Sequence, residues 1–262
     1  MRLLQLSDPH LLADPRGRCR GRTSLTWLRH GLEQALAQLR QRQEPPDQLL
    51  ISGDLCQDES WGGYVRLREL LDELWPAPLP PPLLLAGNHD HALLLRAVLG
   101  RRALLAPALV PLGGVDLLLL DSHVPGWVGG RLGAAQRAWL ERRLVAGTAP
   151  LLVALHHPPL PIGDRELDAI ALADGCELLR LLAATPRWRG LVFGHVHQHW
   201  QGVAPGRAAV PLLGCPSTLC PFGPVQPCPL GRPADPGGRL LELAPTGDIR
   251  HRLLRWSPAE SL

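Results

Sequence analysis

Short apolar runs that end in a cluster of Asp, Asn or His recur along this chain, and they limit the folds that it can adopt. Five such runs are followed, in order, by Asp8 and His10, by Asp54, by Asn88 and His89, by His156 and His157, and by His195 and His197. Segments with the apolar spacing of helices lie between several of them, which predicts an α/β fold. Because sites in open α/β sheets form at the carboxyl ends of the strands, we expect these side chains to converge at one edge of a sheet.

The expected strands and helices account for most of the chain. We expect strands at the N-terminus and over residues 48–55, 82–90, 115–122, 150–159, 190–193, 208–213, 239–244 and 248–255. Helices are expected over residues 25–42, 60–75, 134–146 and 175–184. With 262 residues and 45% hydrophobic composition the chain can bury a sizeable core, so we expect one domain over residues 1–262. Its C-terminal part, 215–262, would contribute a Cys/Pro-rich loop and the final strands.

The composition argues against several classes of function. The formal net charge of +3 comes without a run of clustered basic residues, which gives little support to nucleic-acid binding. No stretch approaches the ~20 apolar residues of a membrane span, and the first residues do not resemble a signal peptide. The six cysteines contain no CxxC pair, so reduced thiols and a cytoplasmic location are expected. Cys215, Cys220 and Cys228 are too irregularly spaced to favour a further metal site over plain thiols.

Three histidines at alternate positions, His195, His197 and His199, form the sharpest local pattern. In an extended segment such side chains project to the same side, and imidazole is the commonest metal-binding side chain. We expect His195 and His197 to be ligands. His199 is followed by Trp200 and Gln201, where the chain is expected to leave the site, so we expect at most an indirect role for it.

Each of the other clusters also has a structural reading when taken alone. Asp8 and Asp54 follow the pattern of ordinary turns, and Asn88 or Asp90 could cap a helix. A pair of adjacent histidines such as His156 and His157 is more often structural than catalytic. All five clusters in order at strand ends are poorly explained by chance, which favours a metal or acid–base site.

These five blocks, D-x-H, G-D, G-N-H-D, a His before x-Pro, and G-H-x-H, resemble the motif set of the calcineurin-like metallophosphoesterases. The resemblance extends from Asp8 to His197. It implies a four-layer αββα sandwich of two mixed β-sheets flanked by helices. It also implies two divalent metal ions at the carboxyl ends of the strands. Mixed nitrogen and oxygen ligands favour Fe or Mn, with Zn as a further candidate.

The resemblance also implies a role for each residue. One metal would be held by Asp8, His10, Asp54 and His197, and the other by Asp54, Asn88, His156 and His195, with Asp54 bridging. His157 does not correspond to a ligand. Asn88 and His89 would be the catalytic pair, in which Asn88 holds a phosphate oxygen and His89 protonates the leaving oxygen. Asn88, His89 and His197 would contact the substrate.

Within that superfamily, LISGDLCQDES, LAGNHD, LHHPPLP and GHVHQ resemble the class III 3′,5′-cyclic-nucleotide phosphodiesterases. This narrower resemblance implies hydrolysis of 3′,5′-cAMP to 5′-AMP by in-line attack of a metal-bridging hydroxide. The chain departs from the pattern at residues 219–236, a segment that could form part of the wall around the nucleotide. The expected partner is a small-molecule phosphodiester.

Several alternatives stay open on the sequence alone. The nearer one is another phosphoesterase of the superfamily, acting on glycerophosphodiesters, dinucleoside polyphosphates or phosphomonoesters. The more distant one is a metal- or nucleotide-binding protein without turnover. The metal pair, the choice between cAMP and cGMP, and the formation of a homodimer are also left open.

Overall fold

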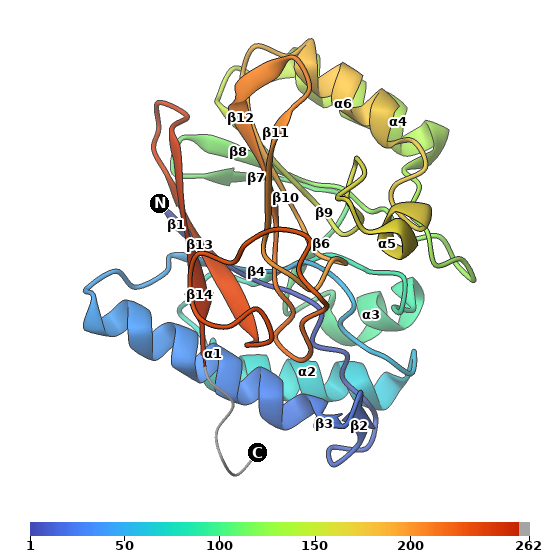
Figure 1. Cartoon of the computed structure of the whole chain (residues 1–262), viewed down its shortest axis with the longest axis vertical. Helices are drawn as coiled ribbons and strands as arrows, with labels where there is room; N and C mark the ends of the chain where they lie inside the picture. The colour runs from blue at the N-terminus through green and yellow to red at the C-terminus, as the bar shows by residue number, and fades with distance from the viewer. Residues whose placement is uncertain (257–262) are drawn as a thin grey trace.

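The computed structural model describes residues 1–256, and its core is a pair of six-stranded mixed sheets (Figure 1). The first sheet has the order β14-β13-β1-β4-β5-β6, made of β1 (Arg2–Leu6), β4 (Gln48–Ile51), β5 (Leu83–Leu84), β6 (Leu104–Leu105), β13 (Gly237–Leu243) and β14 (Ile249–Arg255). The second has the order β11-β12-β10-β9-β8-β7, made of β7 (Ala108–Leu112), β8 (Val115–Leu119), β9 (Leu151–Leu155), β10 (Trp188–Phe193), β11 (Trp200–Ala204) and β12 (Arg207–Gly214). A separate hairpin pairs β2 (Arg18–Cys19) with β3 (Arg22–Thr23).

In the first sheet the parallel strands run from β1 to the edge strand β6, and the antiparallel β13 and β14 form the other edge. In the second sheet parallel strands fill the middle, and the antiparallel β7 and β11 form the two edges. β1, β4, β5 and β6 are parallel to one another, as are β8, β9, β10 and β12. The parallel strands run as continuous apolar segments because both faces of each sheet are covered. This placement brings the carboxyl ends of β1, β4 and β5 toward those of β9 and β10.

Helices cover the outer face of each sheet, as Figure 1 shows, with α1 and α2 on one side and α4 and α6 on the other. The helices are α1 (Ser24–Gln41), α2 (Trp61–Leu74), α3 (Ala92–Leu99), α4 (Gly133–Ala146), α5 (Arg165–Ala169) and α6 (Gly175–Ala183). The predicted four-layer sandwich of two mixed sheets flanked by helices is confirmed. None of the helices within residues 1–256 combines the length and the apolar character needed to cross a membrane.

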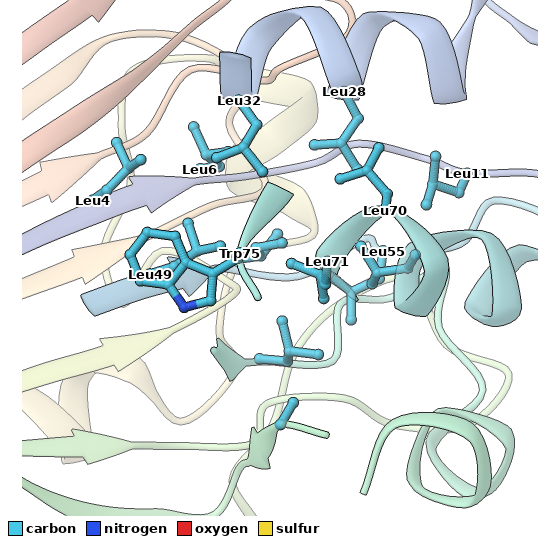
Figure 2. Packing of buried hydrophobic residues seen from close by; sticks show 14 of the residues in the cluster. Leu4, Leu6, Leu11, Leu28, Leu32, Leu49, Leu55, Leu70, Leu71 and Trp75 are labelled. Carbon is cyan, nitrogen blue, oxygen red and sulfur yellow. The ribbon is translucent and has the colours of Figure 1, made fainter. Parts of the chain in front are cut away.

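Three apolar layers hold the four structural layers together. On the first sheet, Leu4 and Leu6 of β1 pack against Leu28 and Leu32 of α1 (Figure 2), whereas Leu3 points the other way, into the layer between the sheets. A third layer packs β9 and β10 against α4 and α6. The alternation along β1 follows from the two-residue period of a strand, which buries both sets of its leucines.

Candidate active site

Five loops that follow β1, β4, β5, β9 and β10 meet at one end of the sandwich. Backbone hydrogen bonds hold the loops together: the Asp8 amide donates to the Gly53 carbonyl at 3.1 Å, the His10 amide to the Asp54 carbonyl at 2.9 Å, and the Gly194 amide to the His156 carbonyl at 3.1 Å. Three loops come from one sheet and two from the other. The expectation of convergence at the edge of a single sheet is therefore wrong, because the site lies across both sheets.

The backbone at this end is held in an unusual conformation. Eight non-glycine residues of the described chain have positive φ, and five of them are predicted metal ligands: Asp8 at 52°, His10 at 48°, Asp54 at 48°, His195 at 68° and His197 at 52°. A left-handed residue of this kind costs on the order of 1–3 kcal/mol and persists only where its surroundings impose it. Such strain clusters at functional sites.

Three motif glycines are required by close contact. A Cβ on Gly53 would lie 2.2 Å from Nδ1 of His156, and one on Gly87 would lie 2.1 Å from Oδ1 of Asp54. A Cβ on Gly194 would lie 2.2 Å from the Ser7 hydroxyl. The glycines of the G-D, G-N-H-D and G-H-x-H blocks therefore allow loops from different strands to approach one another.

Asp8, His10, Asp54 and His197 form one buried cluster whose ligand atoms lie within 4.8 Å of one another. Nε2 of His197 is 3.0 Å from Nε2 of His10 and 3.4 Å from Oδ1 of Asp8. Nδ1 of His197 donates to the Cys220 carbonyl at 2.8 Å, which leaves the lone pair on Nε2 facing the cluster.

A second cluster forms around Asn88. Its Oδ1 lies 3.0 Å from Nδ1 of His195 and 3.3 Å from Nε2 of His156. Nδ1 of His156 donates to the Ser52 carbonyl at 2.8 Å, so its Nε2 lone pair also points inward. Asp54 reaches both clusters with different oxygens, at 3.4 Å from His156 through Oδ1 and 3.7 Å from His10 through Oδ2.

The donor set of the two clusters fits divalent metal ions. Two imidazoles direct lone pairs inward, and carboxylate and amide oxygens complete a group of acceptors. Burial opposes a charge on His197, but the charge and hydrogen bond of Asp8, together with Cys220, raise the pKa of His197 to about 10. Burial also opposes a charge on His156, but Asp54, Asp8 and the Ser52 carbonyl together raise the pKa of His156 to about 9. Metal binding to these imidazoles therefore competes with protons.

His157 lies within reach of His156 and His195, but its ring nitrogens are both engaged. Nε2 donates to the Val128 carbonyl at 3.2 Å, and Nδ1 accepts from the Ser122 hydroxyl at 2.8 Å. Burial lowers the pKa of His157 to about 3, so the ring is neutral. It supports the neighbouring loop and offers no lone pair to a metal.

His199 does not face the site. Its Nδ1 accepts from the guanidinium of Arg239 at 3.2 Å, and Arg239 is a fully buried residue of β13. The segment is not extended here, because β10 ends at Phe193 and both His195 and His197 adopt left-handed conformations, and the chain leaves the site by His199 as the sequence indicated. Burial, and after it the charge of Arg239, lowers the pKa of His199 to about 4.

A cavity of about 690 Å³ opens above the two clusters. His89 lines it and stands edge-on to His10, with ring centroids 5.2 Å apart. The amide of Gln57 donates to Nδ1 of His89 at 3.2 Å and accepts from the Cys19 thiol at 3.7 Å. A neutral His89 therefore carries its proton on Nε2.

Sequence reasoning missed the role of Asp90, the last residue of the G-N-H-D block. This buried carboxylate accepts four hydrogen bonds, from the amides of Gly87, Leu55 and Cys56 and from the Tyr64 hydroxyl, at 2.8–3.0 Å. It ties the loop of Asp54 to the turn of Asn88. His91, and not Asn88 or Asp90, caps the helix that follows.

Comparison with known proteins adds to this geometry. A model of the family "calcineurin-like phosphoesterase" matches residues 1–199. The chain belongs to this family. Its place among the calcineurin-like phosphoesterases makes it a hydrolase of phosphate esters, and the resemblance stated from the motifs is confirmed.

Similar members of the family share nearly the whole chain. A protein of Synechococcus sp. strain WH7803 named "probable cyclic nucleotide phosphodiesterase" is 49% identical over 99% of this chain and 98% of its own length. The 3′,5′-cyclic adenosine monophosphate phosphodiesterase CpdA of Pseudomonas aeruginosa is 37% identical over 97% of this chain and 89% of its own. The crystal structure of a dimetal phosphatase from Danio rerio shares the fold, with a TM-score of 0.64 at 12% identity over 98% of this chain and 99% of that one.

Proposed function

We propose that this chain is a dimetal phosphodiesterase that hydrolyses 3′,5′-cAMP to 5′-AMP. The observation that carries the reaction type is the convergence of two buried His/Asp/Asn clusters, joined by Asp54, below a cavity lined by His89. The substrate is proposed from the relatives, whose printed names specify cyclic nucleotides. We also propose that residues 1–262 act as one domain, and that the enzyme works in the cytoplasm, since its six cysteines are free thiols.

Under this proposal seven residues hold the two metal ions. Asp8, His10 and His197 would hold one ion and Asn88, His156 and His195 the other, and Asp54, which reaches both clusters, would serve both. Fe or Mn is proposed for this mixed set of nitrogen and oxygen ligands. When bound, the two ions would supply positive charge for the phosphodiester and lower the pKa of a water at the site.

The protein groups then bind the phosphate and move the proton. Asp8 and Asp54 supply only two negative charges, and the neutral amide of Asn88 adds none, so the loaded site stays positive toward an anionic diester. Asn88 orients a phosphate oxygen. His89 in its imidazolium form, held at Nδ1 by the Gln57 side-chain amide turned so that its oxygen accepts, delivers its Nε2 proton to the departing 3′-oxygen and is left as the neutral ring.

The test begins with metal-depleted protein reconstituted with Mn²⁺ or Fe²⁺. The substrates are 3′,5′-cAMP, 3′,5′-cGMP, 2′,3′-cAMP, glycerophosphodiesters, dinucleoside polyphosphates, phosphomonoesters and bis-p-nitrophenyl phosphate, with products separated by chromatography. Metal-dependent formation of 5′-AMP from 3′,5′-cAMP is the expected result. Hydrolysis of another substrate class without 5′-AMP formation would contradict the proposed substrate. Stoichiometric nucleotide binding without any product would contradict turnover.

The role of His89 has its own test. His89→Ala is expected to keep both metals and to lose about 10²–10⁴ in kcat on 3′,5′-cAMP, whose leaving alkoxide needs a proton. The loss should be much smaller on bis-p-nitrophenyl phosphate, because p-nitrophenolate leaves without one. His251→Ala, on β14 and outside the cavity lining, is the matched control. Equal losses on the two substrates would remove His89 from the acid role.

A further inference from the structure

One wall of the cavity combines a cation with an aromatic ring. Arg20 lies in the turn of the β2–β3 hairpin, and its guanidinium carbon is 4.7 Å from the ring centroid of Phe222. The same Phe222 ring is stacked on the imidazole of His197, with centroids 4.1 Å apart and planes 6° apart. The imidazole occupies one face of Phe222, so the guanidinium must cover the other. Three segments that are distant in sequence thus form one stack.

The order of the three side chains in this stack sets the distance between Arg20 and the proposed metal centre. Phe222 separates the guanidinium from His197, so Arg20 is two stacking layers away from a proposed metal ligand. A phosphate bound at the proposed metal centre would lie against the ligand side chains and His89, which line the same cavity. The group that reaches Arg20 is therefore the part of the substrate beyond the phosphate.

The cavity has room for such a group. Its volume of about 690 Å³ lies within the range of small-molecule sites, which is roughly 300–1,000 Å³. Leu167 and Ile170, from α5 and the residue that follows it, add apolar surface to the lining, and Glu166 adds a carboxylate. A cavity with a planar cation, apolar surface and hydrogen-bonding groups suits a heteroaromatic ring better than a second phosphate.

The backbone at Arg20 supports a functional role for its side chain. Arg20 has φ of 49° and the next residue, Gly21, has φ of 79°, which are the two left-handed positions of a tight hairpin turn. Asn, Asp or Gly is normally preferred at the first of these positions, because the left-handed conformation is sterically unfavourable for arginine. An exposed cation–π contact is worth only about 0.5–1 kcal/mol, which is a weak structural reason for that choice.

We propose that Arg20, seated on Phe222, forms the nucleobase subsite of this enzyme. The planar guanidinium stacks on the base, and its N–H groups donate to acceptor atoms on the base edge, while the phosphate lies at the metal centre. This inference rests on the proposed cyclic-nucleotide substrate. It assigns to the hairpin and to the Cys/Pro-rich segment 219–236 a shared task in substrate recognition.

The test compares two ligands that differ only in the base. Isothermal titration calorimetry measures the binding of 5′-AMP and of ribose 5-phosphate to the metal-loaded protein. The wild type is expected to prefer 5′-AMP, and Arg20→Ala is expected to reduce that preference by roughly 5- to 150-fold, the range given by base stacking. Arg20→Lys keeps the charge without the planar group and should lose most of the preference as well. Arg16→Ala removes the same charge from the exposed loop before the hairpin, outside the cavity lining, and should leave the preference unchanged.

Three results would overturn the subsite. They are equal binding of the two ligands to the wild type, an unchanged preference in Arg20→Ala, and an equal loss of affinity for both ligands, which would make Arg20 a phosphate contact. Hydrolysis of bis-p-nitrophenyl phosphate and metal content are measured in each variant to verify an intact metal centre. Failure of the proposed function has a different signature: the wild type would hydrolyse the synthetic diester and produce no 5′-AMP from 3′,5′-cAMP.

Discussion

Asp90→Asn is the substitution for which the structure predicts the largest effect from the smallest change in shape. Each carboxylate oxygen accepts two hydrogen bonds: Oδ2 from the amides of Gly87 and Leu55, and Oδ1 from the amide of Cys56 and the hydroxyl of Tyr64. Asparagine has nearly the same volume but replaces one oxygen with an NH₂ group, which can only donate.

The magnitude follows from this geometry. With its NH₂ group toward Gly87 and Leu55, the Asn amide leaves both of these backbone amides without an acceptor; turned the other way, it leaves the Cys56 amide without one, while the Tyr64 hydroxyl rotates and accepts from the NH₂ group. Asp90 is only 1% exposed, so water does not replace the lost partner. The amide takes the second orientation, which leaves one buried donor without a partner at a cost of about 1–3 kcal/mol. Domains of this kind have about 5–15 kcal/mol of stability in total, so the loss is a sizeable fraction of it.

Urea unfolding followed by circular dichroism measures the loss in metal-free protein, and the slope of the transition verifies that both variants unfold from the same compact state. Asp72→Asn is the matched control, because Asp72 on α2 forms an ion pair with Arg102 at a side-chain exposure of 54%, where such pairs contribute little. A loss for Asp90→Asn below about 0.5 kcal/mol, the scale of ordinary surface changes, would refute the assignment of four donors to this carboxylate.

Three further predictions concern the contact of Gly87 with Asp54, the orientation of His89, and the pKa of His251 beside the buried Arg239. Gly87→Ala should lower the unfolding free energy by about 1–3 kcal/mol and lower the metal content measured by mass spectrometry, because the new methyl group would lie 2.3 Å from the Asp54 backbone amide. Full metal occupancy in this variant would contradict the prediction. Gln57→Leu should lower kcat on 3′,5′-cAMP about tenfold, less than removal of the acid itself, and spare bis-p-nitrophenyl phosphate; equal effects would contradict a positioning role. Burial, and then the charge of Arg239, lowers the pKa of His251 to about 4. As the pH falls, this histidine is protonated in the unfolded chain before it is protonated in the folded one. The free energy of unfolding therefore decreases as the pH falls from about 6.5 to about 4. His251→Gln should reduce the difference in unfolding free energy between pH 7 and pH 5 by about 1–2 kcal/mol, as measured by urea unfolding. This figure allows for solvent screening, because the ring is half-exposed.

The positions of the predicted site residues could be found from sequence because each follows a buried strand. β1, β4 and β5 are neighbours in one sheet, and β9 and β10 are neighbours in the other. Parallel neighbours place their carboxyl ends side by side, so the order of motifs along the chain translates directly into proximity. The number of sheets could not be found in this way, since a continuous apolar run is typical of a buried strand in either sheet.

Sequence analysis did not predict several helices and strands whose sequences lack the hydrophobic periodicity of a helix or a strand. α3 has the sequence ALLLRAVL, in which nearly every position is apolar, so no polar face marks it as a helix. β7 contains Pro111, and proline argues against a central strand. The structure places β7 at an edge of its sheet, where a missing amide donor is tolerated. The β2–β3 hairpin consists of two-residue strands, too short for any alternation, and so Arg20 was not considered as a site residue.

The left-handed ligands could not be predicted from sequence because their conformation is imposed by contacts between the sheets. Where the strands lead into the ligand-bearing loops, Gln5 of β1 donates to the Ser52 hydroxyl at 3.0 Å and to the Phe193 carbonyl at 3.3 Å, and the Ser52 hydroxyl donates to Ser7 at 2.8 Å. These bonds join the end of β10 in one sheet to β1 and the residue after β4 in the other. The two proposed metal positions draw their ligands from both sheets, so the separation of the sheets sets the ligand geometry. Leaving one of these buried polar groups without a partner would be costly, so the hydrogen bonds of Gln5 and Ser52 tolerate little change in the distance between the sheets. Apolar packing, which is not directional, would tolerate more.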